Sequence, residues 1–281
     1  MKRYPPIPNV DDAPAELFDA GHLWIQEWVD GELLRFQLQE SGLLRFGDRE
    51  HEYDEDAVPA PYQYAARHVR ERLDRDALRA AVPAVEDVVF FGQSTHRKSV
   101  TYDWDRLPGF LGFDVWSAEK GRFLPPDVVE GIFRQLGLEP VNAVRKEVRA
   151  VDFQPTVDAV PQSAWYDGPA AGIIVRNKVG LRAVLENPVV AATGDVEPIT
   201  SPADEVVRDW LTERRLERLA VALEDRDLAV TVENLSDRAL EALLRERHHQ
   251  LCHPASDVDR QAVRSALAAR ASTFVTDRYR T

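Results

Sequence analysis

Hydrophobic and polar positions along residues 1–198 follow the short-run pattern that is typical of a β-rich domain. Apolar runs bounded by turn residues predict strands over residues 23–39, 43–46, 85–92, 110–116, 173–176 and 181–185. Within the first run, Asp30-Gly31 separates two strand-like halves and predicts a hairpin turn. Polar residues 51–56 and 178–180 predict connecting loops.

Two helices are expected in the same region. Apolar residues at helical spacing, with a charged face, predict one helix over residues 61–81. A second helix is expected over residues 125–136, and Gly137 predicts its end. A strand-rich core with two helices indicates the α+β class.

Apolar residues recur at helical spacing from residue 199 to the C-terminus. Ser201, followed by proline and an acidic first turn, predicts a helix start, and one apolar stripe runs through residues 206–223. A second helix is expected after Ser236 and a third around residues 263–274. We therefore predict a core domain, a linker and a small all-α domain, over residues 1–198, 187–202 and 199–281.

Acidic side chains outnumber basic ones, 48 to 35, and the formal net charge is −13. This balance argues against a broadly basic nucleic-acid-binding surface, although a local basic groove is compatible with it. Lysine is rare and arginine supplies most of the basic charge. An acidic, arginine-rich composition suits a salt-rich host, which we state as a hypothesis.

The sequence also bears on the cellular compartment. It contains no apolar run of about 18 residues, so no membrane span is expected. The N-terminus lacks the apolar stretch of a secretory signal. Cys252 is the single cysteine, which excludes an internal disulfide and fits a reducing compartment. We expect a cytoplasmic protein without a membrane partner.

Five short motifs follow one another in the predicted core. They are Glu27-Trp28-Val29-Asp30-Gly31, Phe91-Gly92-Gln93, Phe113-Asp114-Val115, Ala171-Gly172-Ile173-Ile174-Val175-Arg176-Asn177, and Arg182-Ala183-Val184. Their order resembles the RNA ligase branch of the covalent nucleotidyltransferases. The corresponding family motifs are Glu-Lys-x-Asp-Gly, Phe-Gly-Glu, Phe-Asp-Val, Glu-Gly-x-Val-x-Arg-Asn and a late strand that bears lysine. The resemblance covers residues 20–190 and implies a nucleotidyltransferase fold with mixed or antiparallel sheets.

Four chemically committed positions depart from the family pattern. The family's nucleophilic lysine is Trp28 here, and its two motif glutamates are Gln93 and Ala171. Val184 replaces the late lysine. An indole nitrogen only donates hydrogen bonds and cannot attack the α-phosphorus of ATP. We therefore expect no catalytic residue and no self-adenylylation, because nucleotidyl transfer depends on positioned cations and a neutral amine.

Other positions keep residues that the family uses for nucleotide binding. The resemblance implies that Phe113 stacks on a nucleobase, although core packing explains it equally well. Arg45 and Arg49 both lie where the family has a phosphate- or ribose-contacting arginine, and the sequence does not choose between them. Lys98 lies on a polar loop that RNA phosphate could contact. The residues expected to bind nucleotide are Glu27, Asp30, Arg45, Gln93, Phe113, Arg176, Lys178 and Arg182.

Metal binding is not expected. His249 and His253 have the i, i+4 spacing of helical metal ligands, but no third ligand converges on them in the sequence. ATP and magnesium are expected only if family activity persists.

Three interpretations stay open at this point. The first is an inactive member of the RNA ligase family that binds RNA ends, a nucleotide or an active ligase paralogue. The second is a working ligase or nucleotidyltransferase with altered catalytic groups. The third is an interaction module whose pocket is filled by Trp28. Covalent AMP on the protein separates the second from the others.

Overall fold

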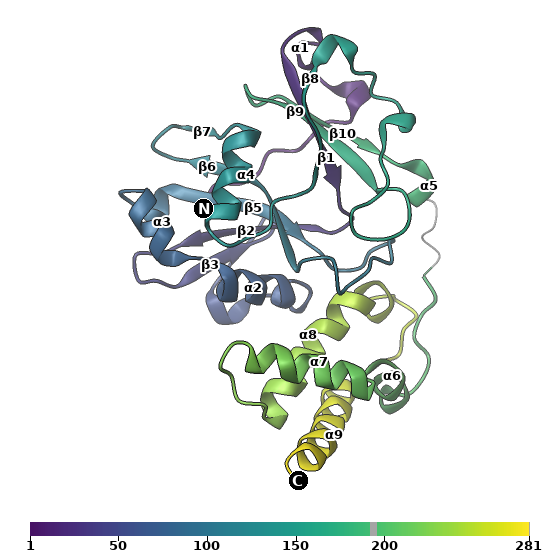
Figure 1. Ribbon diagram of the computed structural model, residues 1–281. Coiled ribbons are helices and arrows are strands. Elements are labelled where there is room, and N and C mark those ends of the chain that lie inside the picture. Colours follow the sequence, from purple (N-terminus) through teal and green to yellow (C-terminus); the bar gives the residue numbers. More distant parts are fainter. Residues whose placement is uncertain (192–195, 281) are drawn as a thin grey trace. The chain divides into compact units, whose positions relative to one another are not determined.

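The computed structural model of the chain describes residues 1–191 and 196–280, and these form two compact units, 1–191 and 196–280. The first unit holds all the strands that the structure describes, and the second is helical (Figure 1). Part of the predicted linker, residues 192–195, lies outside the described residues. The predicted boundary between residues 198 and 199 stays a prediction.

Two antiparallel sheets build the first unit. Sheet A has the strand order β10-β9-β1-β8 and sheet B the order β4-β3-β2-β5-β6-β7. The strands of sheet A are β1 (His22–Trp28), β8 (Ala143–Arg149), β9 (Gly172–Asn177) and β10 (Arg182–Glu186). The strands of sheet B are β2 (Glu32–Leu38), β3 (Leu44–Gly47), β4 (Glu52–Tyr53), β5 (Val88–Ser94), β6 (Phe110–Ser117) and β7 (Arg122–Phe123).

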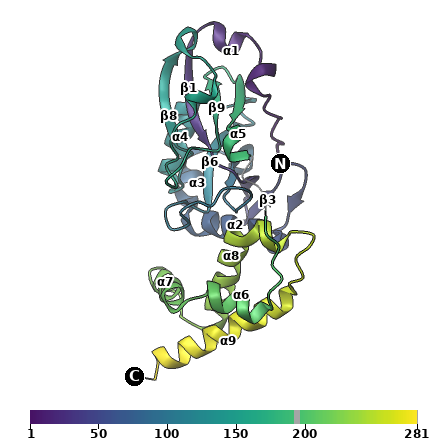
Figure 2. The same cartoon turned by 90° about the vertical axis from the view of Figure 1, so that its right-hand side faces the viewer.

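Each sheet has a core of its own. Helices α2 (Ala60–Arg72), α3 (Arg75–Ala81) and α4 (Pro126–Gln135) pack on one face of sheet B, where Phe36, Phe90 and Phe133 are fully buried. Sheet A buries Leu23 and Val175 against the segment that contains α1 (Glu16–Asp19). Helix α5 (Pro188–Ala191) follows β10. Both views place β1 beside β8 in sheet A (Figures 1 and 2).

The predicted hairpin at Asp30-Gly31 is wrong, because β1 and β2 belong to different sheets. Neither residue has the positive φ that a type I′ turn requires. Instead, the Asp30 carboxylate accepts hydrogen bonds from the Ser99 backbone N–H at 2.7 Å and the Ser99 hydroxyl at 2.6 Å. A Cβ on Gly31 would lie 2.3 Å from the Ser94 carbonyl oxygen. The dipeptide therefore carries the chain from one sheet to the other.

The single helix predicted over residues 61–81 is also wrong, because the chain breaks it into α2 and α3. The break lies at Leu73 and Asp74. The Asp74 carboxylate accepts from the Ala77 N–H at 2.8 Å and caps α3. The predicted loop at residues 51–56 contains the short strand β4 and the start of a 3-10 turn.

Several elements are confirmed. Strand β6 covers the predicted run at residues 110–116, and β5 lies within 85–94 behind a 3-10 turn at Val85–Asp87. Helix α4 ends before Gly137, whose φ of +77° favours glycine. Strands β9 and β10 pair across the predicted turn at residues 178–180. The α+β class with antiparallel sheets is therefore confirmed.

The second unit is built of α6 (Ala203–Trp210), α7 (Glu213–Glu224), α8 (Val232–Leu251) and α9 (Arg260–Arg278). The predicted single stripe over residues 206–223 spans two helices, because Thr212 caps α7 by accepting from the Arg215 N–H. Helix α8 begins before Ser236, at the Thr231 cap. Among the described residues, no helix is long and apolar enough to cross a membrane.

Candidate functional site

A pocket of about 570 Å³ lies between the two sheets of the first unit. Its walls come from β1, β9 and β10 of sheet A and from β2, β5 and β6 of sheet B. The N-terminal segment, helix α2, the β1–β2 connection, the segment before β8 and the loops after β3 and β5 complete the lining. A volume of this size is typical of small-molecule sites. The pocket therefore brings together residues from all five motifs.

Trp28 lines this pocket from the end of β1. It pairs with Gly172 of β9, and a Cβ on that glycine would lie 2.9 Å from the Trp28 Cε3 atom. The indole is half-buried against an apolar cluster that includes Val29, Val141 and Ala171. The position that resembles the family's nucleophile thus presents an aromatic ring to the pocket, and this ring does not fill it.

A buried ionic network forms one wall. The Asp114 carboxylate is fully buried and accepts from Arg176 Nη2 at 3.2 Å and from Arg182 Nη1. Arg176 also donates to the Phe113 carbonyl at 2.7 Å. The Arg182 guanidinium lies 4.9 Å from the Phe123 ring centroid. Both arginines line the pocket, and both are already paired with one carboxylate.

Tyr4 completes this network and was missed in the sequence. Its hydroxyl donates to Asp114 at 3.0 Å and accepts from Arg182. Burial raises the pKa of the Tyr4 hydroxyl, and the charge of Asp114 raises it further, so the hydroxyl keeps its proton. The Tyr4 ring also meets Phe113 edge-on with centroids 5.1 Å apart. No local pattern in the proline-rich N-terminal segment indicates this role.

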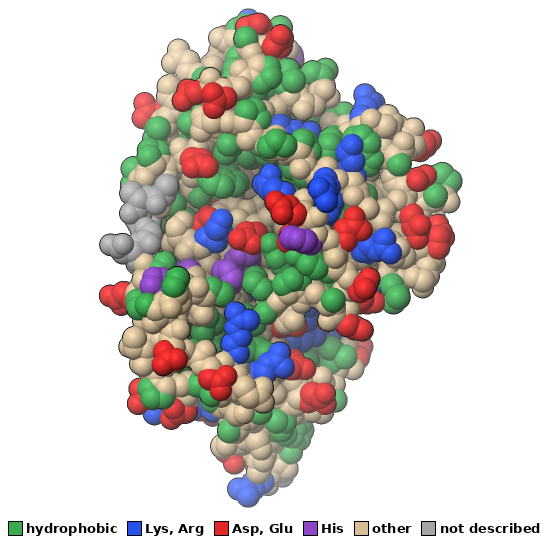
Figure 3. Space-filling view, turned by 180° about the vertical axis from the view of Figure 1, so that it is seen from behind, with side chains coloured by type: hydrophobic (Ala, Val, Ile, Leu, Met, Phe, Trp, Pro, Cys, Tyr) green, Lys and Arg blue, Asp and Glu red, His purple; other side chains and the backbone are tan. Residues whose placement is uncertain are grey.

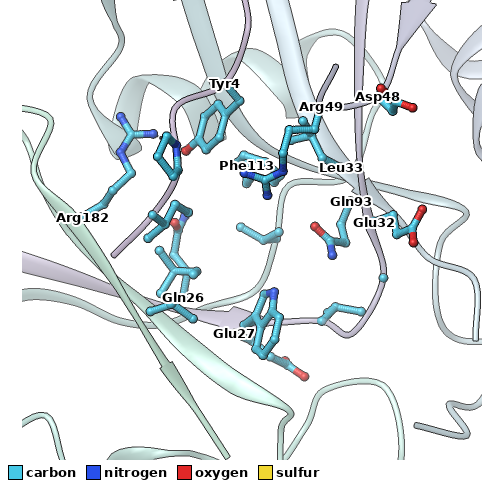
Figure 4. A pocket seen from close by; sticks show the side chains of 18 of the residues that line it. Tyr4, Gln26, Glu27, Glu32, Leu33, Asp48, Arg49, Gln93, Phe113 and Arg182 are labelled. Atoms are coloured by element: carbon cyan, nitrogen blue, oxygen red, sulfur yellow. Dashed lines mark hydrogen bonds between the residues drawn. The ribbon is translucent and has the colours of Figure 1, made fainter. Parts of the chain in front are cut away.

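Glu27 lines the pocket, but its carboxylate is committed elsewhere. It accepts from the Ser163 hydroxyl at 2.6 Å, from Asn142 Nδ2 at 3.0 Å and from the Ala164 N–H at 3.1 Å. Figure 4 shows the Glu27 carboxylate pointing away from the space that Gln26 and Gln93 face. Glu27 therefore fixes β1 to two loops rather than offering a free charge.

Three residues expected to bind nucleotide lie outside the pocket lining. Asp30 faces the loop at residue 99, as described above. Lys178 directly follows β9, and its Nζ lies 2.8 Å from Glu147 Oε1 and 3.4 Å from Asp127 Oδ2. Arg45 Nη1 lies 3.9 Å from Glu52 Oε2. The partners of Asp30 and Lys178 are distant in sequence, so the local sequence did not reveal their surroundings.

Other expected residues do line the pocket. Gln93 and Phe113 are both on its wall, from β5 and β6. Of the two alternative arginines, Arg49 lines the pocket and Arg45 does not. Arg49 is exposed and extends toward the pocket in Figure 4. Lys98 also lines the pocket from an exposed loop position, and it is the one lysine in the lining.

Acidic groups also border the pocket. Burial acts to raise the pKa of Asp48, but hydrogen bonds from the His51 N–H, the Tyr53 hydroxyl and the Glu50 N–H outweigh it and lower the pKa to about 2. Asp48 is therefore ionised at neutral pH. Figure 3 shows acidic and basic side chains interspersed over the face that it presents, in keeping with the acidic composition.

The donor set does not fit a metal-dependent adenylation site of the family type. Gln93 is neutral, Ala171 offers no side-chain ligand, and Glu27 is occupied. Within residues 1–191 and 196–280, no group of three His, Cys, Asp or Glu side chains could hold a metal ion. His253 lies beyond the end of α8 at Leu251, so the two histidines do not share a helical face.

Comparisons with known proteins give the family. No curated protein matches the chain. An archaeal ATP-dependent RNA ligase, form 2, superposes with a TM-score of 0.52 at 15% identity, covering 97% of this chain and 74% of that one. Form 1 of the archaeal ligase superposes with a TM-score of 0.52 at 16% identity, and the match covers 89% of this chain and 64% of that one.

A single-substitution mutant of Naegleria gruberi RNA ligase with ATP and Mn superposes with a TM-score of 0.55 at 13% identity. The match covers 69% of this chain and 58% of that one. This chain thus spans less than two thirds of the archaeal form 1 and Naegleria chains. At these identities the likeness concerns the fold. The family model for RNA ligase matches residues 21–188, which is more than half of the chain. The chain belongs to the RNA ligase family.

Proposed function

We propose that this protein binds a nucleotide, either free or at the end of an RNA strand, without forming a covalent adenylate. The observation that carries the proposal is an open pocket of about 570 Å³ with Trp28 at the nucleophile position. An indole has no lone pair available to attack phosphorus, so binding can continue where covalent transfer cannot.

The pocket residues suit non-covalent recognition. Phe113 offers a ring for stacking on a base, and the Gln93 amide on the pocket wall can both donate and accept hydrogen bonds. Arg49 and Lys98 are positioned at the lining where a phosphate could approach. Stacking and phosphate recognition by Arg and Lys contribute affinity for any base, while the amide contacts can favour one base over another.

The open volume argues against the interpretation in which Trp28 fills the pocket. Trp28 packs against Gly172 and the apolar cluster around Val141, and the cavity persists beside it. A filled pocket would predict no nucleotide binding at all. Calorimetric titration of the pure protein with nucleotides therefore distinguishes the two interpretations.

The covalent step is tested by incubating pure protein with α-labelled ATP and magnesium or manganese, at low and at high salt. The protein is then denatured and the label on the polypeptide is counted. We expect no label, while an active RNA ligase treated in parallel is labelled. A labelled band that survives denaturation would refute the proposal, and mapping the modified residue would identify the group that carries AMP.

Lys98 supports a second candidate, a working nucleotidyltransferase with an altered nucleophile. It is the one lysine in the pocket lining. In that mechanism the neutral Lys98 amine attacks the α-phosphorus, an N–P bond forms, pyrophosphate leaves and the amine proton passes to solvent. Label on the wild-type protein that disappears in Lys98→Arg, and persists in Lys120→Arg outside the lining, would establish this candidate.

We also propose the finer assignments that follow from family membership. The partner would be an RNA end, a nucleotide or an active ligase paralogue, in the cytoplasm. The helical region from residue 199 to residue 281 would be a separate domain. Pull-down of the full chain with labelled RNA that ends in 3′-hydroxyl or 5′-phosphate tests the first of these partners.

A further inference from the structure

The formal charges that line the pocket are unfavourable for a highly charged ligand. Five carboxylates line it, against four arginine and lysine side chains, so the lining carries a formal charge of −1 with His51 neutral. Asp114 lies directly behind the lining and is bonded to two of these cations, which makes the total −2. The carboxylates are Glu27, Glu32, Asp48, Glu50 and Glu186.

Two of the four cations share one buried partner, the Asp114 carboxylate, which offsets one of their two positive charges. Arg176 and Arg182 are 3% and 8% exposed, and both pair with the Asp114 carboxylate. Carbonyl oxygens of Phe113 and Leu124 accept further Arg176 N–H groups. The Tyr4 hydroxyl accepts from Arg182. An incoming phosphate would have to compete with these buried partners, whose desolvation has already been offset.

The other two cations are at the exposed rim. Neither Arg49 nor Lys98 has an ion-pair partner among the described residues, and both are exposed. Exposed acids of the lining, Glu50 and Glu186, are placed in the same pocket. Asp48 stays ionised because its pKa is about 2. Two exposed cations among carboxylates can bind one phosphate, but each further phosphate adds negative charge without adding a cation.

We infer that the pocket prefers a nucleoside or nucleoside monophosphate, such as the terminal nucleotide of an RNA, over a nucleoside triphosphate. This inference rests on the proposed function, because it specifies the ligand of the same site. It also gives the pocket the opposite preference from an enzyme that must capture ATP.

The test is calorimetric titration of the full chain with each of the four ribonucleosides, its 5′-monophosphate and its 5′-triphosphate. Titrations are made at low salt, without and with magnesium, because magnesium reduces the charge of the triphosphate. For any base that binds, we expect the monophosphate to bind at least as tightly as the triphosphate. A triphosphate that binds tenfold more tightly than its monophosphate overturns the inference and leaves the proposed function standing. Absence of binding by all twelve compounds overturns the inference and the free-nucleotide form of the proposed function, and the labelled-RNA pull-down then decides the RNA-end form.

Charge-neutralising variants test the cause. Removing two rim charges in Glu50→Gln/Glu186→Gln should tighten triphosphate binding about fivefold at low salt and leave nucleoside binding unchanged. The control is Glu119→Gln, an exposed glutamate outside the pocket lining, which should change neither. The effect should fade as salt is raised, because exposed charges are screened. Triphosphate affinity that is equal in the double variant and the control would show that rim charge does not set the preference.

Discussion

Trp28 occupies the position on which covalent nucleotidyl transfer would depend, but restoring one lysine does not restore a site. A Trp28→Lys variant would still lack the family's charged groups, because its pocket region keeps Gln93, Ala171 and Val184 at those positions. We expect this variant to take up no AMP from labelled ATP. Loss of the half-buried indole should lower the free energy of unfolding by about 2 kcal/mol.

The check is the labelling assay run beside urea unfolding, so that a folded, unlabelled variant is distinguished from an unfolded one. Label on a folded Trp28→Lys variant would mean that the remaining pocket residues suffice for the chemistry. The other three departures would then be neutral substitutions rather than losses of function.

Asp48 illustrates a pH-dependent contribution from a single carboxylate. Its folded pKa of about 2 lies below the unfolded value of about 3.9, so its stabilisation is present above about pH 4 and is lost as the pH falls toward 2. Its side chain is 20% exposed, and after screening we expect Asp48→Asn to cost about 1–2 kcal/mol at pH 7.

Urea unfolding of wild type and Asp48→Asn at pH 7, 5 and 3 measures this cost. The difference should be equal at pH 7 and 5 and smaller at pH 3. A difference that stays constant down to pH 3 would show that the hydrogen bonds from Tyr53 and the backbone do not depend on the charge of Asp48.

The crossing between the two sheets makes Gly31 a structural requirement at the scale of elements. A Cβ there would lie 2.3 Å from the Ser94 carbonyl oxygen, in the β2–β5 pair. Gly31→Ala should therefore destabilise the protein by about 1–3 kcal/mol. Gly131 in α4 is exposed, and its Cβ would meet nothing within 4 Å. Gly131→Ala should stabilise by about 0.5–1 kcal/mol.

Urea unfolding of both variants gives the comparison, with Gly131→Ala as the matched control for a glycine-to-alanine change. Equal stability of Gly31→Ala and wild type would mean that the chain can shift at the crossing. The position of the pocket between the sheets would then be less firmly fixed than the contact suggests.

Elements were predictable from the sequence where local periodicity and turn residues decide them. Strand β6, helix α4 and the β9–β10 pair follow from such patterns. The hairpin failed because periodicity does not say which sheet a strand joins. Asp30 finds its partner at Ser99, far along the chain. The single helix over 61–81 failed because Asp74 caps a new helix there, and the spacing of apolar residues does not distinguish a cap from a residue on a charged helix face.

The candidate site was predictable in part, through the order of the motifs. Motif order indicated that Gln93, Phe113, Arg176 and Arg182 belong to one region, and the structure brings them to one pocket. It did not indicate Tyr4, whose hydroxyl meets Asp114 across 110 positions of the chain. Side-chain direction is set by such non-local partners. A motif therefore predicts where a residue lies in the fold more reliably than it predicts whether its charged side chain is available to a ligand.

The whole chain carries a formal charge of −13, and self-repulsion among the excess acids opposes the compact state at low ionic strength. Salt screens this repulsion within a Debye length of about 10 Å at 0.1 M and about 3 Å at 1 M. We expect the free energy of unfolding to rise between 0.02 and 1 M KCl, by roughly 1 kcal/mol for charges that are mostly exposed.

Thermal and urea unfolding across that salt series, at constant pH 7, measures the effect. A continued rise above 1 M would support the salt-rich host that the arginine-rich, lysine-poor composition suggests, since simple screening is nearly complete by then. Full stability in dilute buffer, unchanged by salt, would instead show that local ion pairs such as Arg278 with Glu217 and Glu224 already balance the acids. The same salt should weaken the contacts of Arg49 and Lys98 with phosphate while leaving nucleoside binding intact, so stability and charge-dependent binding would change in opposite directions.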